Sequence, residues 1–306
     1  MRWRKPRGLQ RTLLGASALV SMALGVPAPC GATTGAVAAT TASRASINTL
    51  TCATPYVPMY HIDGLAQLRR WSLSSAIDGS GSWTEQQLGS GWSGLTVISG
   101  GSGVLFAIDS QANLRWYQDK GFAGTGGAAW NPASGSVIGA GWGSLTSVTS
   151  GGQGVIYGVD SLGRLHWYRY TGTNGSNSWA SNSGAVIGTG WTGLQIIGSG
   201  SGIIYAVNSS GVLFWYRHLD PTGGTASWAD SGVAQQIGSG WSFTSTGSMG
   251  GGVLLARDST GGMRWYRHTD PLGGTATWAN SGVGVSEGAG WDGAAVTADV
   301  AGCTAS

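Results

Sequence analysis

Charged side chains are scarce in this chain of 306 residues, where 16 Lys and Arg and 13 Asp and Glu together make up 9%. So low a charge density excludes a highly charged disordered chain and a coiled coil. The basic residues Arg2, Arg4, Lys5, Arg7 and Arg11 all lie at the N-terminus, and without them acidic groups outnumber basic ones. We therefore expect no basic surface for nucleic acid or for anionic lipid.

Long hydrophobic runs are also lacking. The longest covers residues 12–26, which is shorter than the roughly 20 residues that span a bilayer. It follows the basic N-terminus and precedes small residues around Ala28 and Ala32, a layout typical of a secretory signal peptide. We therefore predict a signal peptide over residues 1–32, a secreted mature protein and no membrane insertion. Residues 33–51, mostly Ala, Thr and Ser, are predicted to form a flexible lead-in.

Cysteine is limited to Cys30, Cys52 and Cys303. Cleavage after Ala32 would remove Cys30 and leave one pair in an oxidising compartment, whereas cleavage after Ala28 would leave an odd thiol. The sequence does not choose between the two cleavage sites.

Helical periodicity is missing as well, while Gly (56 residues) and Trp (16 residues) are abundant. The tryptophans mark a repeat of about fifty residues. Gly-x-Gly-Trp recurs at what we call the corner tryptophans: Trp92, Trp142, Trp191, Trp241 and Trp291. A second set, the strand tryptophans, comprises Trp71, Trp116, Trp167, Trp215 and Trp265, and a third, the loop tryptophans, comprises Trp83, Trp130, Trp179, Trp228 and Trp278.

Each repeat contains four short β-patterned segments, which predicts an all-β five-bladed propeller with four antiparallel strands per blade. A linear β-solenoid is the competing architecture. The first repeat lacks a leading strand, whereas residues 294–300 form a leading strand with nothing after it. We therefore expect the C-terminal strand to complete the first blade and close the ring, which removes the open edges of a solenoid. This closure brings Cys52 and Cys303 to one hairpin end and predicts a disulfide between them.

Trp-Ala, then Ile-Gly-x-Gly-Trp, then Gly-Ile-Ile-Tyr-Ala-Val at residues 202–207, resembles the repeat of the tachylectin family of five-bladed propeller lectins. The resemblance extends over residues 56–300 and implies a multivalent lectin domain, taken here as residues 52–306. It further implies that the ligands are glycans with N-acetylated amino sugars, such as N-acetylglucosamine or N-acetylgalactosamine, bound near the blade junctions. We expect a monomer.

The residues themselves separate two roles for tryptophan. The strand and corner tryptophans suit packing between blades, and the corner glycines permit a tight turn with positive φ. The loop tryptophans stand at the edge of polar loops, where an indole can stack on a sugar ring. Our predicted sugar-binding residues are therefore the loop tryptophans Trp83, Trp130, Trp179, Trp228 and Trp278, with Asn131, Asn182, Asp230 and Asn280 to bond sugar hydroxyls.

Other functions fit the sequence less well. The motif Gly284-Val-Ser-Glu-Gly matches a nucleophile elbow but lies on a strand with no following helix, and the carboxylates are not paired as a glycosidase requires. We therefore predict no catalytic residue. His61 and His166 form no zinc spacing, so neither a metal nor a cofactor is expected. His218 and His268 are expected to brace loops. The alternatives are a protein-binding propeller scaffold and a cell-surface adhesion module that binds no sugar.

Overall fold

The computed structural model describes residues 47–293 and 296–306. The predicted signal peptide, Cys30 and most of the lead-in lie outside these residues. The described chain is all-β, its only helical elements being short 3₁₀ turns at Trp142–Ser144, Ala229–Gly232 and Ala279–Gly282.

Five antiparallel sheets form the blades, confirming the predicted architecture. Blade 1 contains β21 (Val296–Ala298), β2 (Val57–Ile62), β3 (Gln67–Leu73) and β4 (Trp83–Ser90). Blade 2 contains β5 (Thr96–Gly101), β6 (Val104–Ile108), β7 (Leu114–Gln118) and β8 (Ser136–Gly139). Blade 3 contains β9 (Leu145–Gly152), β10 (Val155–Asp160), β11 (Leu165–Arg169) and β12 (Ala185–Gly188). Blade 4 contains β13 (Gln195–Gly198), β14 (Ile203–Val207), β15 (Leu213–Arg217) and β16 (Gln235–Gly238). Blade 5 contains β17 (Ser245–Gly250), β18 (Val253–Arg257), β19 (Met263–Arg267) and β20 (Val285–Ser286).

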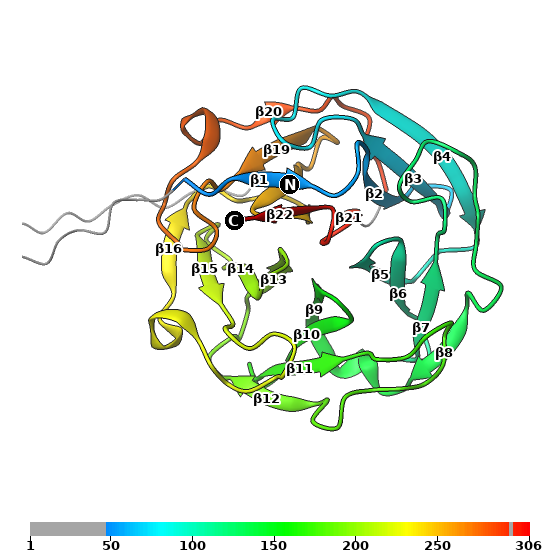
Figure 1. The fold of residues 1–306 in the computed structure, drawn as a ribbon, viewed down its shortest axis with the longest axis horizontal. Helices are drawn as coiled ribbons and strands as arrows, with labels where there is room; N and C mark the ends of the chain where they lie inside the picture. The colour runs from blue at the N-terminus through cyan, green and yellow to red at the C-terminus, as the bar shows by residue number, and fades with distance from the viewer. Residues whose placement is uncertain (1–46, 294–295) are drawn as a thin grey trace, which may run out of the picture. The chain divides into compact units, whose positions relative to one another are not determined.

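The sheets stand around a common axis with their first strands innermost (Figure 1). The ring closes as expected, because β21 from the C-terminal end pairs antiparallel with β2, placing Met59 opposite Ala298. β21 therefore supplies the inner strand that the first repeat lacks.

A further two-stranded ribbon joins the chain ends. β1 (Leu50–Cys52) pairs antiparallel with β22 (Cys303–Ala305), and β22 meets β17 of blade 5 at Gly250. Cys52 and Cys303 are directly opposite one another and form the predicted disulfide. The end of the expected lead-in differs from the expectation, since Asn48 already donates its backbone N–H to Thr269 and β1 starts at Leu50. Backbone pairing, which its composition did not indicate, orders this segment.

The strand tryptophans pack between blades. Trp215 is fully buried and its indole Nε1 donates to the Pro271 carbonyl of blade 5 at 2.9 Å. The next residue, Tyr216, faces the other way and contacts Trp191 of blade 3 with ring centroids 4.4 Å apart. Consecutive side chains of one strand thus serve both neighbouring blades, as strand geometry requires.

Blade 1 departs from this pattern, and the assignment of Trp71 to the strand tryptophans is wrong. In the register of the blades, Arg70 lies opposite Tyr60 as Trp215 lies opposite Tyr205. Arg70 is fully buried and forms an ion pair of 2.6 Å with Asp119 of blade 2. Trp71 instead occupies the position of Tyr216, one residue later, and therefore faces the opposite side of the sheet.

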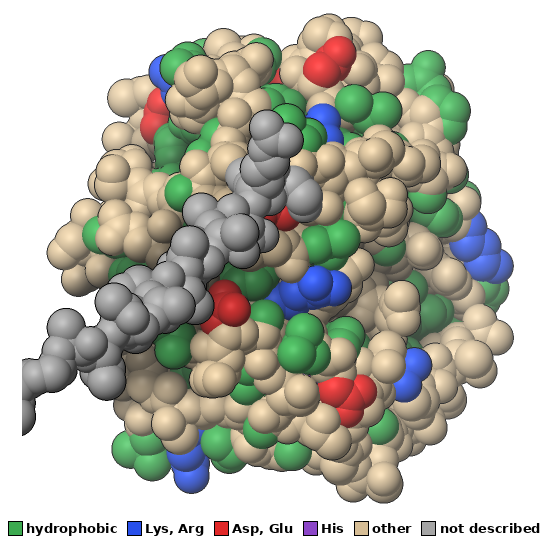
Figure 2. All heavy atoms as spheres, turned by 60° about the vertical axis from the view of Figure 1, so that its left-hand side comes forward, with side chains coloured by type: hydrophobic (Ala, Val, Ile, Leu, Met, Phe, Trp, Pro, Cys, Tyr) green, Lys and Arg blue, Asp and Glu red, His purple; other side chains and the backbone are tan. Residues whose placement is uncertain are grey.

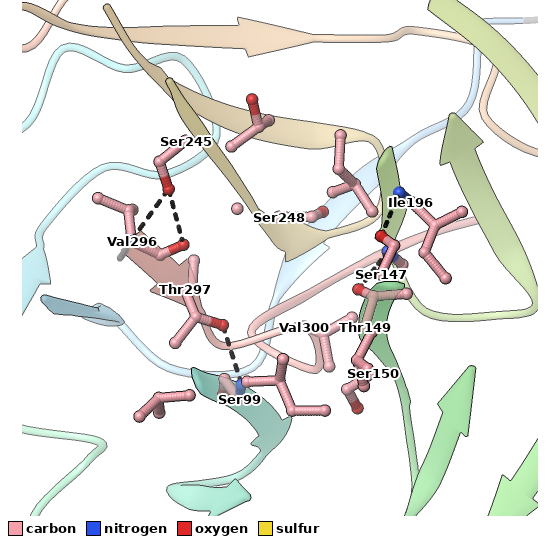
Figure 3. Close-up of a pocket in the computed structure, with 18 of the residues that line it drawn as sticks. Ser99, Ser147, Thr149, Ser150, Ile196, Ser245, Ser248, Val296, Thr297 and Val300 are labelled. Atoms are coloured by element: carbon pink, nitrogen blue, oxygen red, sulfur yellow. Dashed lines mark hydrogen bonds between the residues drawn. The ribbon is translucent and has the colours of Figure 1, made fainter. Parts of the chain in front are cut away.

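A cavity of about 150 Å³ lies at the centre of the ring, between the inner strands (Figure 3). Hydroxyl groups line it, yet many of them are used to join blades. Ser147 Oγ and Thr149 Oγ1 of blade 3 accept the backbone N–H groups of Ile196 and Gly198 in blade 4. Thr297 of the closing strand accepts the N–H of Ser99 at 2.9 Å. These bonds give the central serines and threonines a structural role.

Figure 2 shows one face of the molecule, on which Lys and Arg side chains are isolated among polar and hydrophobic ones. No basic patch gathers on that face. None of the described residues belongs to a helix long and apolar enough to cross a membrane.

Candidate functional site

A cluster of three aromatic side chains recurs at the blade junctions. It combines a corner tryptophan of one blade with the tyrosine and the loop tryptophan of the next blade. At the junction of blades 4 and 5, Trp241 lies 5.0 Å from Tyr266 and 5.6 Å from Trp278, measured between ring centroids. At the junction of blades 3 and 4, the corresponding distances from Trp191 to Tyr216 and Trp228 are 4.4 and 6.0 Å. The same cluster forms from Trp92, Tyr117 and Trp130 and from Trp142, Tyr168 and Trp179.

The loop tryptophans are half-buried rather than freely exposed. Each of four donates its indole Nε1 across the junction to a backbone carbonyl of the preceding blade. The pairs are Trp130 with Leu88, Trp179 with Ile138, Trp228 with Ile187 and Trp278 with Ile237, at 2.8–2.9 Å. Because the N–H is used, only the ring of the indole remains to contact a ligand. The loop tryptophans therefore join blades as well as line the junction.

The glycines of the Gly-x-Gly-Trp corner hold the corner tryptophan in place. At the junction of blades 4 and 5, the second glycine, Gly240, adopts a φ of 76°. A Cβ atom on the first glycine, Gly238, would lie only 2.8 Å from Trp241 Nε1. The corner thus requires glycine twice, once for the turn and once for close contact with the indole.

A pocket of about 190 Å³ opens over this cluster, lined by Trp241, Phe243, Tyr266 and Trp278 and by the Ile237–Gly240 corner. All five corner tryptophans are buried, whereas the tyrosines and loop tryptophans are partly exposed. The tyrosines were missed as candidate site residues. The signal for them is the Trp-Tyr pair that recurs in blades 2–5, because the tyrosine faces the junction opposite the one that its tryptophan packs into.

The four polar candidates do not form a repeated set. Asn131 is buried and its amide donates to the side chains of Gln118 and Asn174. Asn182 donates to the Gly223 carbonyl of the next blade at 2.7 Å. Asp230 and Asn280 are exposed in 3₁₀ turns with φ of 48° and 51°. Asp230 and Asn280 occupy equivalent positions, two residues after their loop tryptophans, whereas Asn131 and Asn182 stand one and three residues after theirs.

The histidines of blades 4 and 5 brace loops, as expected. His218 Nε2 donates to the Thr225 carbonyl at 2.7 Å, and its Nδ1 accepts from the Tyr157 hydroxyl of blade 3. His268 makes the same two contacts with Thr275 and Tyr205. Burial lowers the pKa of both imidazoles, which favours the neutral ring that this bonding pattern needs. No group of metal-ligating side chains occurs among the described residues.

The junction of blades 5 and 1, which we call the closing junction, has a different lining. Its aromatic cluster is Trp291, Trp71 and Trp83, with centroid distances of 4.6 and 5.4 Å from Trp291. Trp71 here replaces the tyrosine of the other junctions. The pocket measures about 770 Å³, against about 190 Å³ at the junction of blades 4 and 5.

Charged groups also enter the closing junction. Glu287 stands where the other corners have Leu88, Ile138, Ile187 and Ile237, and its carboxylate, instead of a backbone carbonyl, accepts the Trp83 indole N–H at 2.7 Å. Burial raises the pKa of Glu287. Glu85 replaces the small residues at 135, 184, 234 and 284, and Asp292 replaces Ser, Gly or Thr after the corner tryptophan.

The nucleophile-elbow match places Ser286 exposed on the two-residue strand β20. Glu287, the next residue, is buried against Trp83. Glu287 lines the pocket of the closing junction, whereas Ser286 does not.

The sequence profile of the Tachylectin family matches residues 61–296. A search of curated proteins finds no match. Among solved structures, the SapL1 lectin in complex with alpha methyl fucoside is similar, with 13% identity, a TM-score of 0.38, and coverage of 77% of this chain and 82% of that one. A mutant of AofleA from Arthrobotrys oligospora has 14% identity and a TM-score of 0.34, with coverage of 72% and 71%. These scores are too low to support an argument about the site.

The family match covers residues of all five blades. The chain therefore belongs to the Tachylectin family of carbohydrate-binding propeller lectins.

Proposed function

We propose that the protein is a secreted, monomeric and multivalent lectin that binds N-acetylated amino sugars, without catalysis, at the aromatic junctions between its blades. The observation that carries this proposal is the recurrence of one aromatic cluster at four junctions. A packing role alone needs large apolar groups but does not need the loop tryptophan and the tyrosine to stay partly exposed over a pocket.

The chemistry of each junction suits a sugar. Indole and phenol rings present apolar faces for the C–H surface of a pyranose and for the methyl of an acetamide, and small polar groups beside them can bond hydroxyls. In this arrangement the loop tryptophans Trp130, Trp179, Trp228 and Trp278 stack on the ligand while their N–H groups hold the blades together. Asn182, Asp230 and Asn280 remain proposed hydroxyl partners, and the buried Asn131 would orient the loop.

Multivalency compensates for weak single sites. A shallow junction buries little of a sugar, and hydroxyls exchange bonds to water for bonds to protein at small net gain. Several sites on one rigid ring raise the effective concentration of each later contact, so that avidity on a dense glycan surface exceeds single-site affinity by about a hundredfold. The disulfide between Cys52 and Cys303 fits an oxidising, extracellular setting.

Calorimetric titration with N-acetylglucosamine and N-acetylgalactosamine tests the proposal. Trp228→Leu should lower the number of sites by one and leave the affinity of the rest unchanged. The matched control is Leu219→Ser, on an exposed loop of the same blade, which should change neither quantity. An unchanged stoichiometry in folded Trp228→Leu would assign the loop tryptophans to packing alone.

A competing function is a scaffold for one protein partner. That function needs one specialised face, whereas the aromatic cluster is repeated around the ring. Binding to a glycan array by the purified chain, with competition by free monosaccharide, separates the two functions.

A further inference from the structure

We infer that the closing junction is a second type of site, which selects a hexosamine carrying a free ammonium group instead of an acetamide. This inference rests on the proposed function, because it assumes that the junctions bind sugars. It concerns the closing junction, where Glu85, Glu287 and Asp292 stand at positions that are uncharged in the other blades.

The first argument is charge. Asp63, Glu85, Glu287 and Asp292 line the closing junction together with the single guanidinium of Arg69. Of the described residues that line the pocket between blades 4 and 5, none is charged. Arg69 is shared, because it bonds Asp63 at 2.6 Å and also contacts Glu85. With its carboxylates ionised, the pocket is therefore net negative.

Two charged groups beside the pocket do not change that balance. Arg257 donates to the Trp291 carbonyl at 2.9 Å, and the charge of Asp78 acts on Glu287. One is positive and the other negative, so together they offset each other. The pocket keeps an excess of carboxylates.

The second argument comes from buried polar atoms that have no hydrogen-bond partner among residues 47–293 and 296–306. Three of these atoms belong to residues that line this pocket: His61 Nδ1, Trp71 Nε1 and Glu287 Oε1. Glu287 is only 8% exposed. Buried polar atoms are nearly always hydrogen-bonded in folded proteins, so such a cluster points to a bound group.

The bonding needs of these atoms define that group. His61 Nε2 donates to the Asp292 carbonyl, and burial lowers the pKa of this imidazole, which leaves Nδ1 as an acceptor. Glu287 Oε1 is a second acceptor, and Trp71 Nε1 is a donor. A ligand must therefore present at least two hydrogen-bond donors together with an acceptor. An ammonium on a pyranose does so, with three N–H bonds and adjacent hydroxyl or ring oxygens.

An acetamide fits the same lining poorly. It has one N–H donor, and its carbonyl oxygen would be placed among carboxylates. The aromatic groups also favour the cation, because Trp binds cations over its ring face better than Tyr does, and Trp71 stands where the other junctions have Tyr. The closing pocket, at about 770 Å³, also has room for more than one sugar of an oligomer.

The test uses the full mature chain with its disulfide intact. Calorimetry with a glucosamine trimer, at a pH that protonates its amines, should show one site per chain, and binding should weaken as salt is raised because ion pairing is screened. The N-acetylated trimer should bind that site about tenfold more weakly, the change expected when a charge-assisted bond is lost.

Variants that restore the residue of the other blades test the assignment without introducing foreign side chains. Three single variants, Glu85→Ala, Asp292→Ser and Glu287→Ile, should each weaken binding of the glucosamine trimer by about tenfold or more. Asp258→Asn is the matched control: it removes one carboxylate at a position where blade 4 has Asn208, and it should leave trimer binding unchanged. Thermal unfolding curves establish that each variant is folded.

Trp278→Leu distinguishes this inference from the proposed function. It should remove one site for N-acetylated sugars and leave the glucosamine site intact. If N-acetylated sugars bind nowhere, the proposed function fails while a Glu85-dependent glucosamine site still supports this inference. Equal binding of the glucosamine trimer to wild type and to the carboxylate variants would overturn the inference. Equally tight binding of a lysine trimer would overturn its assignment to a sugar.

Discussion

Two junctions of the ring are filled by different types of residue at equivalent positions. Between blades 4 and 5, Trp215 is buried against the Pro271 loop, and the neighbouring Tyr205 bonds His268. Between blades 1 and 2, the same positions hold Arg70, Tyr60 and Asp119, and Arg70 forms an ion pair of 2.6 Å with Asp119. The position requires a long side chain that bonds a loop carbonyl of the next blade, a role filled by Trp215 with Pro271 and by Arg70 with Gly126.

The comparison teaches that the propeller fixes volume and hydrogen bonding at a junction more strictly than residue type. A tryptophan contributes mainly buried apolar area. A buried ion pair must instead offset the desolvation of two charges and depends on both partners being present. The junctions should therefore respond differently to substitution.

The largest effect is expected from Trp215→Ala, which should lower the free energy of unfolding by about 3–5 kcal/mol, since it removes a buried aromatic and leaves a cavity. Urea unfolding with the disulfide intact measures this change. The matched comparison is Trp228→Ala, a loop tryptophan that is only half-buried. An equal loss from both variants would contradict the separation of strand and loop tryptophans into different roles.

Asp119→Ala should follow, with a loss of about 3 kcal/mol or more, because it leaves the guanidinium of Arg70 buried without a countercharge. The same urea titration applies. A loss below about 1 kcal/mol, the range of exposed ion pairs, would show that the pair is not sealed from water.

Removing the disulfide by the double change Cys52→Ser and Cys303→Ser should lower the free energy of unfolding by about 2–4 kcal/mol. The cross-link joins residues 251 positions apart, so its loss frees nearly the whole ring in the unfolded state. Wild type treated with a reductant serves as the control and should match the variant. A variant as stable as the oxidised wild type would assign ring closure to β21 alone.

A smaller change in the free energy of unfolding is expected when the junction of blades 1 and 2 is given the residues found at the junction of blades 4 and 5. Arg70→Trp combined with Asp119→His should change the free energy of unfolding by no more than about 2 kcal/mol, in the stabilising direction, because hydrophobic replacement of a buried pair is often neutral or favourable. Each single variant is the control and should be less stable than the double variant. If the double variant is the least stable of the three, the two junctions do not accept each other's residues.

The smallest effect concerns pH. Burial raises the folded-state pKa of Glu287 above its ordinary value, so the stability tied to its protonated form is present in acid and is lost as pH rises through that raised pKa. The Glu287→Ile variant should therefore gain stability relative to wild type as pH rises from acid towards neutral. Thermal unfolding across this range measures the trend.

Asp258→Asn is a control for which the opposite dependence of stability on pH is expected. Hydrogen bonds from Thr260 and Gly262 lower the pKa of Asp258, so its contribution is present above its ordinary pKa and is lost as pH falls. The deficit of this variant should shrink in acid. Parallel trends in the two variants would contradict the assigned directions.

Much of the fold was predictable because the repeat is long and its landmarks are large. The spacing of the corner tryptophans indicated five blades. The strand missing from the first repeat and the unmatched strand near the C-terminus indicated closure and the pairing of Cys52 with Cys303, and the structure confirms all of these. The ribbon of β1 and β22 was not predicted, since strands of three residues carry no readable pattern.

The register of blade 1 was misread for a physical reason. Arg69-Arg70-Trp71 offers one tryptophan, and aligning it with the other strand tryptophans shifts the strand by one residue. In a β-strand such a shift moves every side chain to the opposite face. Only pairing with β2, which places Arg70 opposite Tyr60, decides that Arg70 is buried and that Trp71 faces the closing junction.

The sequence by itself therefore determined the repeat, the all-β blades, the closure and the residue types available for binding, because these follow from periodicity along the chain. The tertiary structure alone decided which side chains meet. Tyr266 and Trp278 of blade 5 meet Trp241 of blade 4, and Glu287 of blade 5 meets Trp83 of blade 1, 204 positions away. Such contacts depend on how two blades pack face to face. The sequence of one blade specifies only one side of that interface.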